Sequence, residues 1–445
     1  MFRKILIANR GEIALRILRA CRELGVRAVV AYSERDRDSL PVRLADESIC
    51  IGPAAISQSY LNIPNIVSAA LVTDCEAIHP GYGFLSENPY VAEICDSYGL
   101  TFIGPPPAIL EEMGSKARAR YLMRQAGLPV LPGSEEPVAS VVEARELAAA
   151  IGYPVLVKAV NGGGGKGMRL VHNDAEMLRL YPLAQVESET AFGRSELYVE
   201  KCLTGARHIE IQILADSAGR VIHLGERECS LQRRHQKILE ETPSPAVSET
   251  LRNELGQAAV SGARAIQYAG VGTFEFLVDS DARFYFIEMN MRIQVEHPIT
   301  EMVTGVDIAK WQIRLASGEP LGLAQEDVRM NGHAIECRIN AEDPERAFLP
   351  DIGTIREYVP CGGPGIRVES HLYPGYQLAP EYDSLLAKVI AWGGTRHEAI
   401  LRMDRALDEL VLNGVKTTRP FHQRLLKDAA FLNGRTNINL VESYL

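Results

Sequence analysis

Residues 270–290, GVGTFEFLVDSDARFYFIEMN, predict two β-strands joined by a polar turn, because aromatic and β-branched residues flank a short run of polar ones. If the hairpin is symmetric about this turn, Glu275 lies opposite Glu288 and Phe276 lies opposite Ile287. Two carboxylates on one face of an apolar hairpin need an explanation, since charged residues are seldom buried without partners. The hairpin therefore predicts a functional site as well as a fold.

A divalent cation explains the opposed carboxylates. Two carboxylates that face each other across a ladder repel, and Asn290, two residues beyond Glu288, lies on the same face. Oxygen ligands from Glu and Asn suit Mg²⁺, which keeps several waters and bridges to phosphates. We expect Glu275, Glu288 and Asn290 to hold such an ion. The alternative is a carboxylate pair that shares a proton or meets a nearby arginine.

A glycine-rich loop lies between two predicted strands in YPVLVKAVNGGGGKGMRLV, residues 153–171. The loop matches GxGxxG at Gly162, Gly164 and Gly167, but it leads into a strand, whereas a Rossmann loop opens a helix. It also lacks the GxxxxGK[ST] pattern of a P-loop. What remains is a glycine hairpin whose N–H groups can close on phosphate oxygens, with Lys158 supplying charge. The alternative is a flexible surface hairpin.

Basic residues gather in ERECSLQRRHQK, residues 226–237. If this segment is a strand, Arg233, His235 and Lys237 share one side and can bind a small anion or a terminal phosphate. The alternative is a solvated charged face. The preceding segment YVEKCLTGARHIEIQIL fits an adenine and ribose edge after a strand, through Glu200, Lys201 and His208.

The N-terminal segment alternates strand, helix and strand. Residues 4–9, KILIAN, predict a buried strand, RGEIALRILRACRELG has helical spacing and ends at Gly25, and VRAVVAYS predicts the next strand. This βαβ unit indicates a parallel α/β domain. The glycine fingerprint of an NAD domain is missing, because ANRGEIA contains Gly11 alone.

The remainder of the chain divides at proline-rich stretches such as IGPPPAILEEMGSK, residues 103–116. Residues 186–300 are expected to alternate strands and turns, and the last segment to mix strands with one clear helix, RHEAILRMDRALDELV. The predicted domains are residues 1–113, 114–330 with a lid subdomain at about 131–203, and 331–445.

The composition limits which binding partners and which cellular compartment are expected for the protein. The 445 residues carry a formal net charge of −10, so nothing attracts nucleic acid or an anionic membrane globally. No two of the eight cysteines are closer in sequence than Cys75 and Cys95, which excludes a CxxC zinc or redox pair and favours reduced thiols in the cytoplasm. The N-terminus, MFRKILIANRGEIALRIL, is neither a signal peptide nor a membrane span, because charges interrupt it.

Taken together, the motifs resemble those of ATP-grasp ligases and, more closely, of biotin carboxylase, the ATP-dependent subunit or domain of biotin-dependent carboxylases. The resemblance rests on ILIANRGEIALRI, AIHPGYGFLSEN, FIGP, MGSK, RHIEIQ, RRHQK, GTFEF, RIQVEHPITEM, GHAIECRINAEDP and NGVKTT, which span nearly the whole chain. It implies a multidomain α/β and α+β fold: a Rossmann-like parallel α/β domain, an ATP-grasp domain with a mobile glycine-rich lid, and a C-terminal mixed α+β domain.

The resemblance also implies roles for individual residues. It implies that ATP contacts Lys116, Lys158, Gly164, Gly165, Glu200, Lys201, Leu203, His208, Gln232 and His235. It implies that two ions of Mg²⁺ or Mn²⁺ are held by Glu275, Glu288 and Asn290. It implies that bicarbonate meets Lys237, Arg292, Gln294 and Val295. Glu296 matches the general base, Arg338 matches the arginine that steadies the biotin enolate, and Tyr82 would lie near biotin.

Two positions depart from the family pattern. Met291 stands where the family more often has Thr, and strand alternation puts it on the face opposite the metal ligands. Asn161 begins the glycine loop, where a longer glycine run is common. We expect little effect from Met291 and a stiffer lid entrance from Asn161.

The implied reaction joins ATP, bicarbonate and a biotinyl carrier to give ADP, phosphate and carboxybiotin through carboxyphosphate. Arg292, Gln294 and Glu296 would then form an anion-and-base site, unless Arg292 and Glu296 merely pair with each other. No Met-Lys-Met biotinylation segment is present, so a separate biotin carboxyl carrier protein and carboxyltransferase subunits are expected, most simply those of bacterial acetyl-CoA carboxylase in fatty-acid synthesis. A homodimer is also implied.

Two other functions stay open at this point. Another ATP-grasp ligase, forming a carboxylate–amine bond through an acyl phosphate, would also use the glycine loop and the acid pair. A nucleotide-binding regulatory protein without catalysis is the second, although Glu275, Glu288, Arg292 and Glu296 argue against it. Membership of a pyruvate carboxylase or of another acyl-CoA carboxylase also fits, since this half-reaction never meets the final acceptor.

Overall fold

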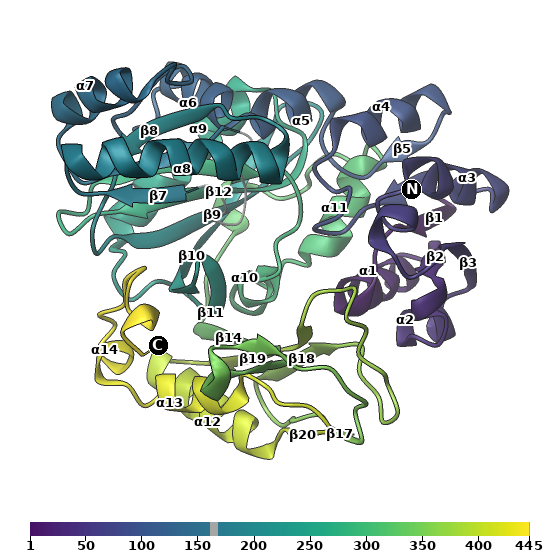
Figure 1. The fold of residues 1–445 in the computed structure, drawn as a ribbon. Coiled ribbons are helices and arrows are strands. Elements are labelled where there is room, and N and C mark those ends of the chain that lie inside the picture. The colour runs from purple at the N-terminus through teal and green to yellow at the C-terminus, as the bar shows by residue number, and fades with distance from the viewer. Residues whose placement is uncertain (161–167, 445) are drawn as a thin grey trace.

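The structure is a computed structural model that describes residues 1–160 and 168–444 (Figure 1). The N-terminal part is the predicted parallel α/β domain: β1 (Lys4–Ile7) pairs in parallel with β2 (Arg27–Ser33), and α1 (Gly11–Glu23) connects them. The sheet order is β3-β2-β1-β4-β5. Its other elements are α2 (Leu40–Leu44), β3 (Glu47–Gly52), α3 (Ile63–Val72), β4 (Ala77–His79), α4 (Pro89–Ser97) and β5 (Thr101–Phe102).

A second unit contains the strands on either side of the glycine loop. Its antiparallel sheet has the order β7-β6-β8, and two helices pack on it around Val155 and Val157. Residues 161–167, which include Gly164 and Gly165, lie outside the described residues. The elements of this region are α5 (Pro107–Gly114), α6 (Lys116–Gln125), α7 (Val141–Ile151), β6 (Val155–Ala159), β7 (Met168–Val171), α8 (Asp174–Phe192) and β8 (Leu197–Lys201).

A long antiparallel sheet carries the candidate site. Its order is β13-β12-β9-β10-β11-β14-β19-β18, so it joins strands from both sides of residue 330. A hydrogen-bonded sheet places residues far apart in sequence directly opposite each other. The strands are β9 (Arg207–Ala215), β10 (Val221–Arg233), β11 (Gln236–Thr242), β12 (Gly270–Val278), β13 (Phe284–Asn290), β14 (His333–Asn340), β18 (Ile366–Ser370) and β19 (Leu385–Gly393).

The expectation of alternating strands and turns over residues 186–300 is wrong at three helices: the range begins inside α8, ends inside α10 (His297–Thr304), and contains all of α9. Residues Glu249–Ala265 form α9, which packs on β9 and β10. The side chain of Ser248 caps the helix by accepting from the backbone N–H of Leu251, and Leu251, Leu255 and Ala259 recur at helical spacing as buried residues.

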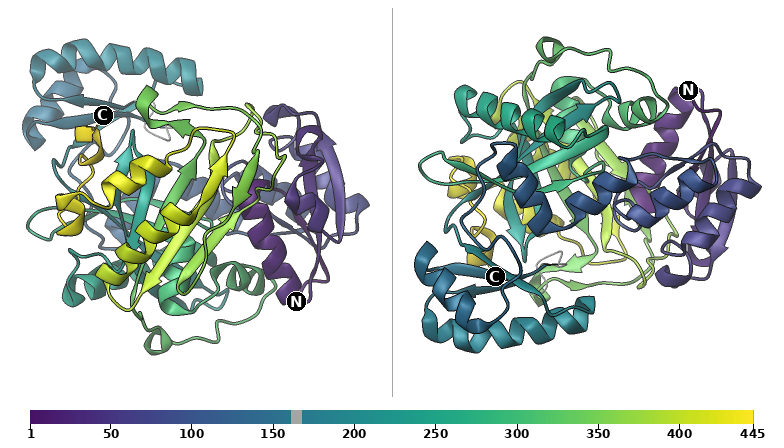
Figure 2. Two further views of the ribbon diagram at one scale, coloured as in Figure 1. Left: turned by 90° about the horizontal axis from the view of Figure 1, so that it is seen from below. Right: turned by 90° about the horizontal axis from the view of Figure 1, so that it is seen from above.

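The remaining elements cover the long sheet and close the C-terminal part. α10 begins directly after the strand exit at Glu296, which is its N-cap. In both views of Figure 2 the N-terminal α/β domain and the α7–α8 layer lie at opposite ends of the molecule. These elements are α10 (His297–Thr304), α11 (Ile308–Ala316), β15 (Glu342–Asp343), β16 (Leu349–Pro350), β17 (Glu357–Val359), α12 (Arg396–Glu409), β20 (Val411–Asn413), α13 (Arg419–Leu425) and α14 (Ala429–Leu432).

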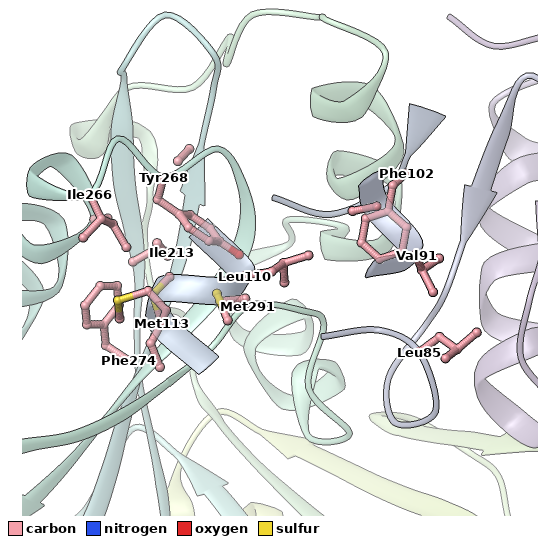
Figure 3. Close-up of a cluster of buried hydrophobic side chains, with 14 of the residues drawn as sticks. Leu85, Val91, Phe102, Leu110, Met113, Ile213, Ile266, Tyr268, Phe274 and Met291 are labelled. Carbon is pink, nitrogen blue, oxygen red and sulfur yellow. The ribbon is translucent and has the colours of Figure 1, made fainter. Parts of the chain in front are cut away.

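A shared hydrophobic cluster fixes the hairpin β12–β13 against the N-terminal domain. Figure 3 shows part of it, with Leu110 and Met113 of α5, Tyr268 before β12, Phe274 on β12, and Met291 after β13. Met291 is buried there, so its side chain lies in the core, as alternation predicts for that position. None of the described helices combines the length and apolarity needed to span a bilayer.

Candidate active site

One buried ammonium group lies at the centre of the charged cluster. Lys237 on β11 donates to Glu275 Oε1 at 2.9 Å and to Glu296 Oε1 at 2.7 Å, and it also pairs with Glu210. Strand register explains this meeting, because Glu210 and Glu275 are direct partners across β9 and β12. All three carboxylates are buried. The predicted metal hairpin and the predicted base are therefore joined by one cation.

The cations around Glu296 keep it ionised. Burial would raise the pKa of Glu296, but the charges of Lys237 and Arg338 outweigh it and hold that pKa well below its usual range. Burial likewise would lower the pKa of Lys237, yet the surrounding carboxylates, Glu210 first among them, raise it. Both groups are charged at neutral pH.

The guanidinium of Arg338 is the second cation that contacts Glu296. Its Nε donates to Glu240 Oε1 at 2.6 Å, and its Nη2 donates to Glu296 Oε2 at 2.9 Å. Its Nη1 has no hydrogen-bond partner in the part of the chain that the structure describes. Arg338 therefore has N–H groups available for an anionic oxygen.

Arg292 is held by an acid from the N-terminal domain. Its Nε donates to Glu87 Oε2 at 2.9 Å, Nη2 donates to Asn290 Oδ1 at 2.8 Å, and Nη1 donates to Gln294 Oε1 at 3.1 Å. The alternative in which Arg292 pairs with Glu296 is not what the described residues show, because the ion-pair partner of Arg292 is Glu87. Its guanidinium is thus anchored across the domain boundary.

The pairing of the two hairpin strands matches the predicted one at Glu275 and Glu288 and differs from it beyond them. Glu275 is the direct partner of Glu288, but Phe276 is opposite Phe286, with a register shift between Glu275 and Phe276. The expectation that Phe276 faces Ile287 is wrong because β13 contains one extra residue at this point. Such a bulge bends a strand and re-aims neighbouring side chains.

The donor set fits a divalent cation. Asn290 Nδ2 donates to Glu275 Oε1 at 2.7 Å, and His208 Nε2 lies 2.8 Å from Glu275 Oε2. The Glu288 side chain is 41% exposed and lies 3.4 Å from Lys116 Nζ. Each carboxylate oxygen has further lone pairs, so these oxygens can accept a metal in addition to their present donors.

A second group of charged residues, singled out from the sequence for ATP, lies on β6 and β8. Lys158 and Arg120 both pair with the buried carboxylate of Glu200, and Lys201 Nζ donates to the backbone oxygens of Gly152 and Tyr153, at 2.9 and 3.0 Å. Burial would raise the pKa of Glu200, but Lys158 and Arg120 lower it. Glu200 therefore stays ionised and fixes Lys158 at the end of its strand.

The basic cluster is a hairpin turn and not a continuous strand. Arg233 pairs with Gln236 across β10 and β11, and the two turn residues, Arg234 and His235, have φ of 50° and 64°. The expectation that Arg233, His235 and Lys237 share one side of a strand is therefore wrong. Arg233 instead donates to Glu342 Oε2 at 2.8 Å, while His235 is exposed at the turn.

Comparison with known proteins covers the whole chain. Family models match residues 1–110 (biotin carboxylase, N-terminal domain), 115–324 (carbamoyl-phosphate synthase L chain, ATP binding domain) and 336–443 (biotin carboxylase C-terminal domain). Biotin carboxylase 1 of Bacillus subtilis is 54% identical over 100% of this chain and 99% of its own length. The biotin carboxylase of Nostoc sp. is 56% identical over 99% of each chain. The chain belongs to the biotin carboxylase family.

Solved structures of this family share the fold. The biotin carboxylase domain dimer of Hydrogenobacter thermophilus 2-oxoglutarate carboxylase, in complex with MgADP and bicarbonate, superposes with a TM-score of 0.97 at 49% identity, covering 100% of this chain and 98% of that one. A biotin carboxylase–β,γ-ATP complex from Campylobacter jejuni gives 0.97 at 48% identity, with coverage of 100% and 99%. The predicted family and fold class are confirmed, and the chain is an ATP-dependent ligase that carboxylates biotin.

Other residues singled out from the biotin carboxylase motifs lie around this cluster. Tyr82 OH pairs with Glu12, and the backbone oxygen of Val295 accepts from Lys388 Nζ at 2.8 Å. Gln232 is buried and donates to the Cys229 oxygen at 2.8 Å. Leu203 follows β8 and is half-buried.

Several charged residues of this biotin carboxylase site were missed by sequence reasoning: Glu87, Arg120, Glu210, Arg227 and Glu240. Arg227 is wholly buried and pairs with Glu210, and its Nη1 donates to Gln212 Oε1 at 2.8 Å. Glu87 lies in AIHPGYGFLSEN and Glu210 in RHIEIQ, so both stood inside quoted motifs without a role. An acid within an apolar strand, such as Glu210, was the available signal.

Proposed function

We propose that the chain uses ATP and bicarbonate to carboxylate biotin on a separate carrier protein, through carboxyphosphate. The observation that carries this proposal is the position of Glu296, which lies between Lys237 and Arg338 while Lys237 also holds Glu275. Lys237 thus contacts both the proposed base and a proposed metal ligand. A base, a cation for the attacking anion and a metal ligand each serve phosphoryl transfer to a one-carbon anion.

ATP is proposed to lie between the glycine hairpin and the long sheet. Charge-assisted contacts to its phosphates would come from Lys116, Lys158 and His235, and from backbone N–H groups at Gly164 and Gly165. The adenine would contact Glu200, Lys201 and Leu203, and the ribose His208 and Gln232. The pairing of Lys158 with Glu200 supports this arrangement, because it holds an ammonium at the edge of β6.

Glu275, Glu288 and Asn290 would hold Mg²⁺ or Mn²⁺, with two ions expected. Ions bound there would neutralise charge that spreads over the transferred phosphoryl group. The mutual orientation of the acids, fixed by their direct pairing across β12 and β13, supports this assignment.

The proposed reaction starts with bicarbonate held by Lys237, Arg292, Gln294 and the Val295 backbone. Glu296 accepts the proton of bicarbonate while a bicarbonate oxygen attacks the γ-phosphorus of ATP. The bond from that phosphorus to the leaving oxygen of ADP breaks. Carboxyphosphate then splits into CO₂ and phosphate, and the phosphate takes the ureido N–H proton of biotin. Arg338 stabilises the enolate oxygen, the ureido nitrogen attacks CO₂, and Tyr82 lies near the biotin ring.

The enzyme complex to which this chain belongs, its oligomeric state and its location are also proposed. Relatives include a pyruvate carboxylase component of Methanothermobacter thermautotrophicus, 52% identical over 100% of this chain, but the relatives from Bacillus, Nostoc and Pseudomonas are named biotin carboxylase. We therefore propose a subunit of acetyl-CoA carboxylase in fatty-acid synthesis, working with carrier and carboxyltransferase partners. The dimer named for the Hydrogenobacter domain supports a homodimer, and the eight free thiols support a cytoplasmic location.

The proposed domain limits are residues 1–113, 114–330 with the lid at about 131–203, and 331–445. The segments that the family models match each lie within one of these domains.

ADP release with and without bicarbonate and free biotin tests the proposed function. We expect release to depend on bicarbonate and to rise when biotin is added, because carboxyphosphate decomposes productively once biotin accepts CO₂. ADP release that is indifferent to bicarbonate but responds to an amine and a carboxylate substrate would favour another ATP-grasp ligase. ATP binding without turnover would favour a regulatory protein.

Lys158→Ala is expected to weaken ATP binding by about tenfold or more, because a hydrogen bond between two charged groups contributes about 1.5–3 kcal/mol. Equilibrium titration with a non-hydrolysable ATP analogue measures the change. Lys427→Ala is the matched control, since Lys427 is 63% exposed and pairs with Asp404 on the surface. An unaltered affinity in Lys158→Ala would remove Lys158 from the phosphate site.

A further inference from the structure

Two buried glutamates face each other beneath Arg338. Glu240 on β11 and Glu336 on β14 are direct partners in the antiparallel ladder, and neither has any exposed surface. Side chains of directly opposed residues lie on the same face with their Cβ atoms about 4.5–5.5 Å apart. Two carboxyl groups are therefore held side by side within the protein interior.

The hydrogen bonds of this pair are incomplete. Glu240 Oε1 accepts from Arg338 Nε at 2.6 Å, whereas Glu240 Oε2 and both oxygens of Glu336 have no hydrogen-bond partner among the described residues. An ionised carboxylate that is buried without donors is strongly disfavoured. One proton placed between the two carboxyl groups would satisfy an oxygen of each.

The charged groups that face Glu336 do not neutralise it directly. On β19, Lys388 Nζ donates to the Val295 oxygen at 2.8 Å and lies 3.0 Å from Glu12 Oε1. On β14, Arg338 is engaged by Glu240 and Glu296. On β19, Ile390 is the strand partner of Glu336. α10, which begins at His297 directly after Glu296, packs on β14, and its residues Ile299 and Val303 form an apolar cluster with Ala334 and Ile390. Beyond β14, α13 contributes His422, which contacts the Arg338 backbone oxygen at 2.8 Å.

Electrostatics agree with this geometry. Burial raises the pKa of Glu336 well above its ordinary value, and the charge of Lys388 lowers it too little to compensate. Burial also raises the pKa of Glu240, despite the charge of Arg338. Two buried carboxyl groups with no cation between them disfavour each other's ionisation, so the pair titrates as a unit.

We propose that Glu240 and Glu336 share one proton and that this acid pair positions Arg338 for the biotin enolate. With one proton, the pair presents a single negative charge to Arg338 Nε, Nη2 remains on Glu296, and Nη1 stays available for substrate. A second charge at Glu336 would draw the guanidinium into the sheet and raise the proton affinity of Glu296. The positioning role rests on the proposed function, whereas the shared proton does not.

Stability against pH tests the shared proton without any assay of activity. An acid with a raised pKa in the folded state is protonated there but ionised in the unfolded chain above about pH 4.3, so its contribution lowers stability as pH rises. Glu336→Gln removes that loss. Denaturant unfolding gives the folding equilibrium constant of each protein. We expect the ratio of the variant's constant to that of the unmodified protein to rise at least tenfold between about pH 5.5 and about pH 8.

Glu241→Gln is the matched control. Glu241 follows Glu240 in the sequence and is equally buried, but its carboxylate accepts from His333 at 2.8 Å and from Arg396 at 2.6 Å. Burial acts to raise the pKa of Glu241, yet these partners lower it. This variant should lose stability, and lose more at about pH 8 than in acid. Equal pH dependence of Glu336→Gln and the unmodified protein would show that Glu336 is ionised and would overturn the shared proton.

Infrared spectroscopy and kinetics complete the test. We expect the carbonyl band of a protonated carboxylic acid at neutral pH, present in Glu241→Gln and lost in Glu336→Gln. Glu336→Leu, which removes the group that shares its proton with Glu240, should raise KM for free biotin at least fivefold. Glu336→Gln, whose amide can still donate to Glu240, should keep KM near that of the unmodified protein. An absent band overturns the shared proton; an unchanged KM in Glu336→Leu overturns the positioning role alone.

Discussion

Glu296→Gln is expected to lower bicarbonate-dependent ADP release by about 10²–10⁴-fold while ATP affinity stays nearly unchanged. A positioned general base contributes about this factor, and an amide of the same size cannot accept the proton. Glu296 contacts Lys237 and Arg338 and none of the residues proposed for adenine or ribose. Steady-state turnover and analogue titration measure the two quantities separately.

The control for this variant is Glu319→Gln, in which a half-exposed glutamate near Arg314 is neutralised outside the cluster. It should retain full turnover. If Glu296→Gln also turned over normally, Glu296 would not be the base. A loss of ATP affinity in parallel with turnover would instead indicate that the carboxylate orders the whole site.

The low pKa of Glu296 describes the protein without substrate. An efficient base has a pKa near the working pH, yet Lys237 and Arg338 hold the pKa of Glu296 well below its usual range against the effect of burial. These are the two cations that we assign to bicarbonate and to the biotin enolate. If they turn toward substrate anions as proposed, Glu296 would lose their charge, and its pKa would rise toward the value that proton transfer needs.

The acid pair could be predicted from sequence because its geometry is local. The period of two residues and a short polar turn suffice to bring Glu275 opposite Glu288. The same reasoning fails one residue later, since nothing in FYFIEMN marks the bulge. Likewise, RRHQ lacks the Asn-Gly or Gly signal of a tight turn, and the positive φ of Arg234 and His235 is unusual for such residues.

The charge pairs that complete the site depend on long-range order. Glu87 reaches Arg292 only because the N-terminal domain packs on the hairpin through a shared core. Glu240 meets Glu336 because β11 pairs with β14, which is distant in sequence. Periodicity within a segment gives the face of a residue but not the strand beside it. Partners of this kind therefore require the sheet order.

Lys237→Met is expected to be the most damaging of these substitutions to stability as well as to turnover. Removing the cation leaves Glu210, Glu275 and Glu296 buried with one positive partner fewer, and breaking a buried ion pair in this way costs about 3–5 kcal/mol. Denaturant unfolding measures the loss. Lys237→Arg, the control, keeps the charge and should recover most of the stability but little turnover, because a planar guanidinium replaces a point charge.

The loss of stability in Lys237→Met should depend on pH, whereas the loss caused by a simple packing defect should not. In the unmodified protein Lys237 helps to lower the pKa of Glu275 and Glu296, although burial opposes it. Stability from such groups is present above their unfolded pKa of about 4.3 and is lost as pH falls through the folded value. Without the ammonium, burial dominates and those carboxylates take up protons more readily. The variant should therefore approach the unmodified protein in mild acid and diverge from it as pH rises. A deficit that is the same at both pH values would mean that Lys237 contributes packing alone, and that the ammonium does not organise the three acids.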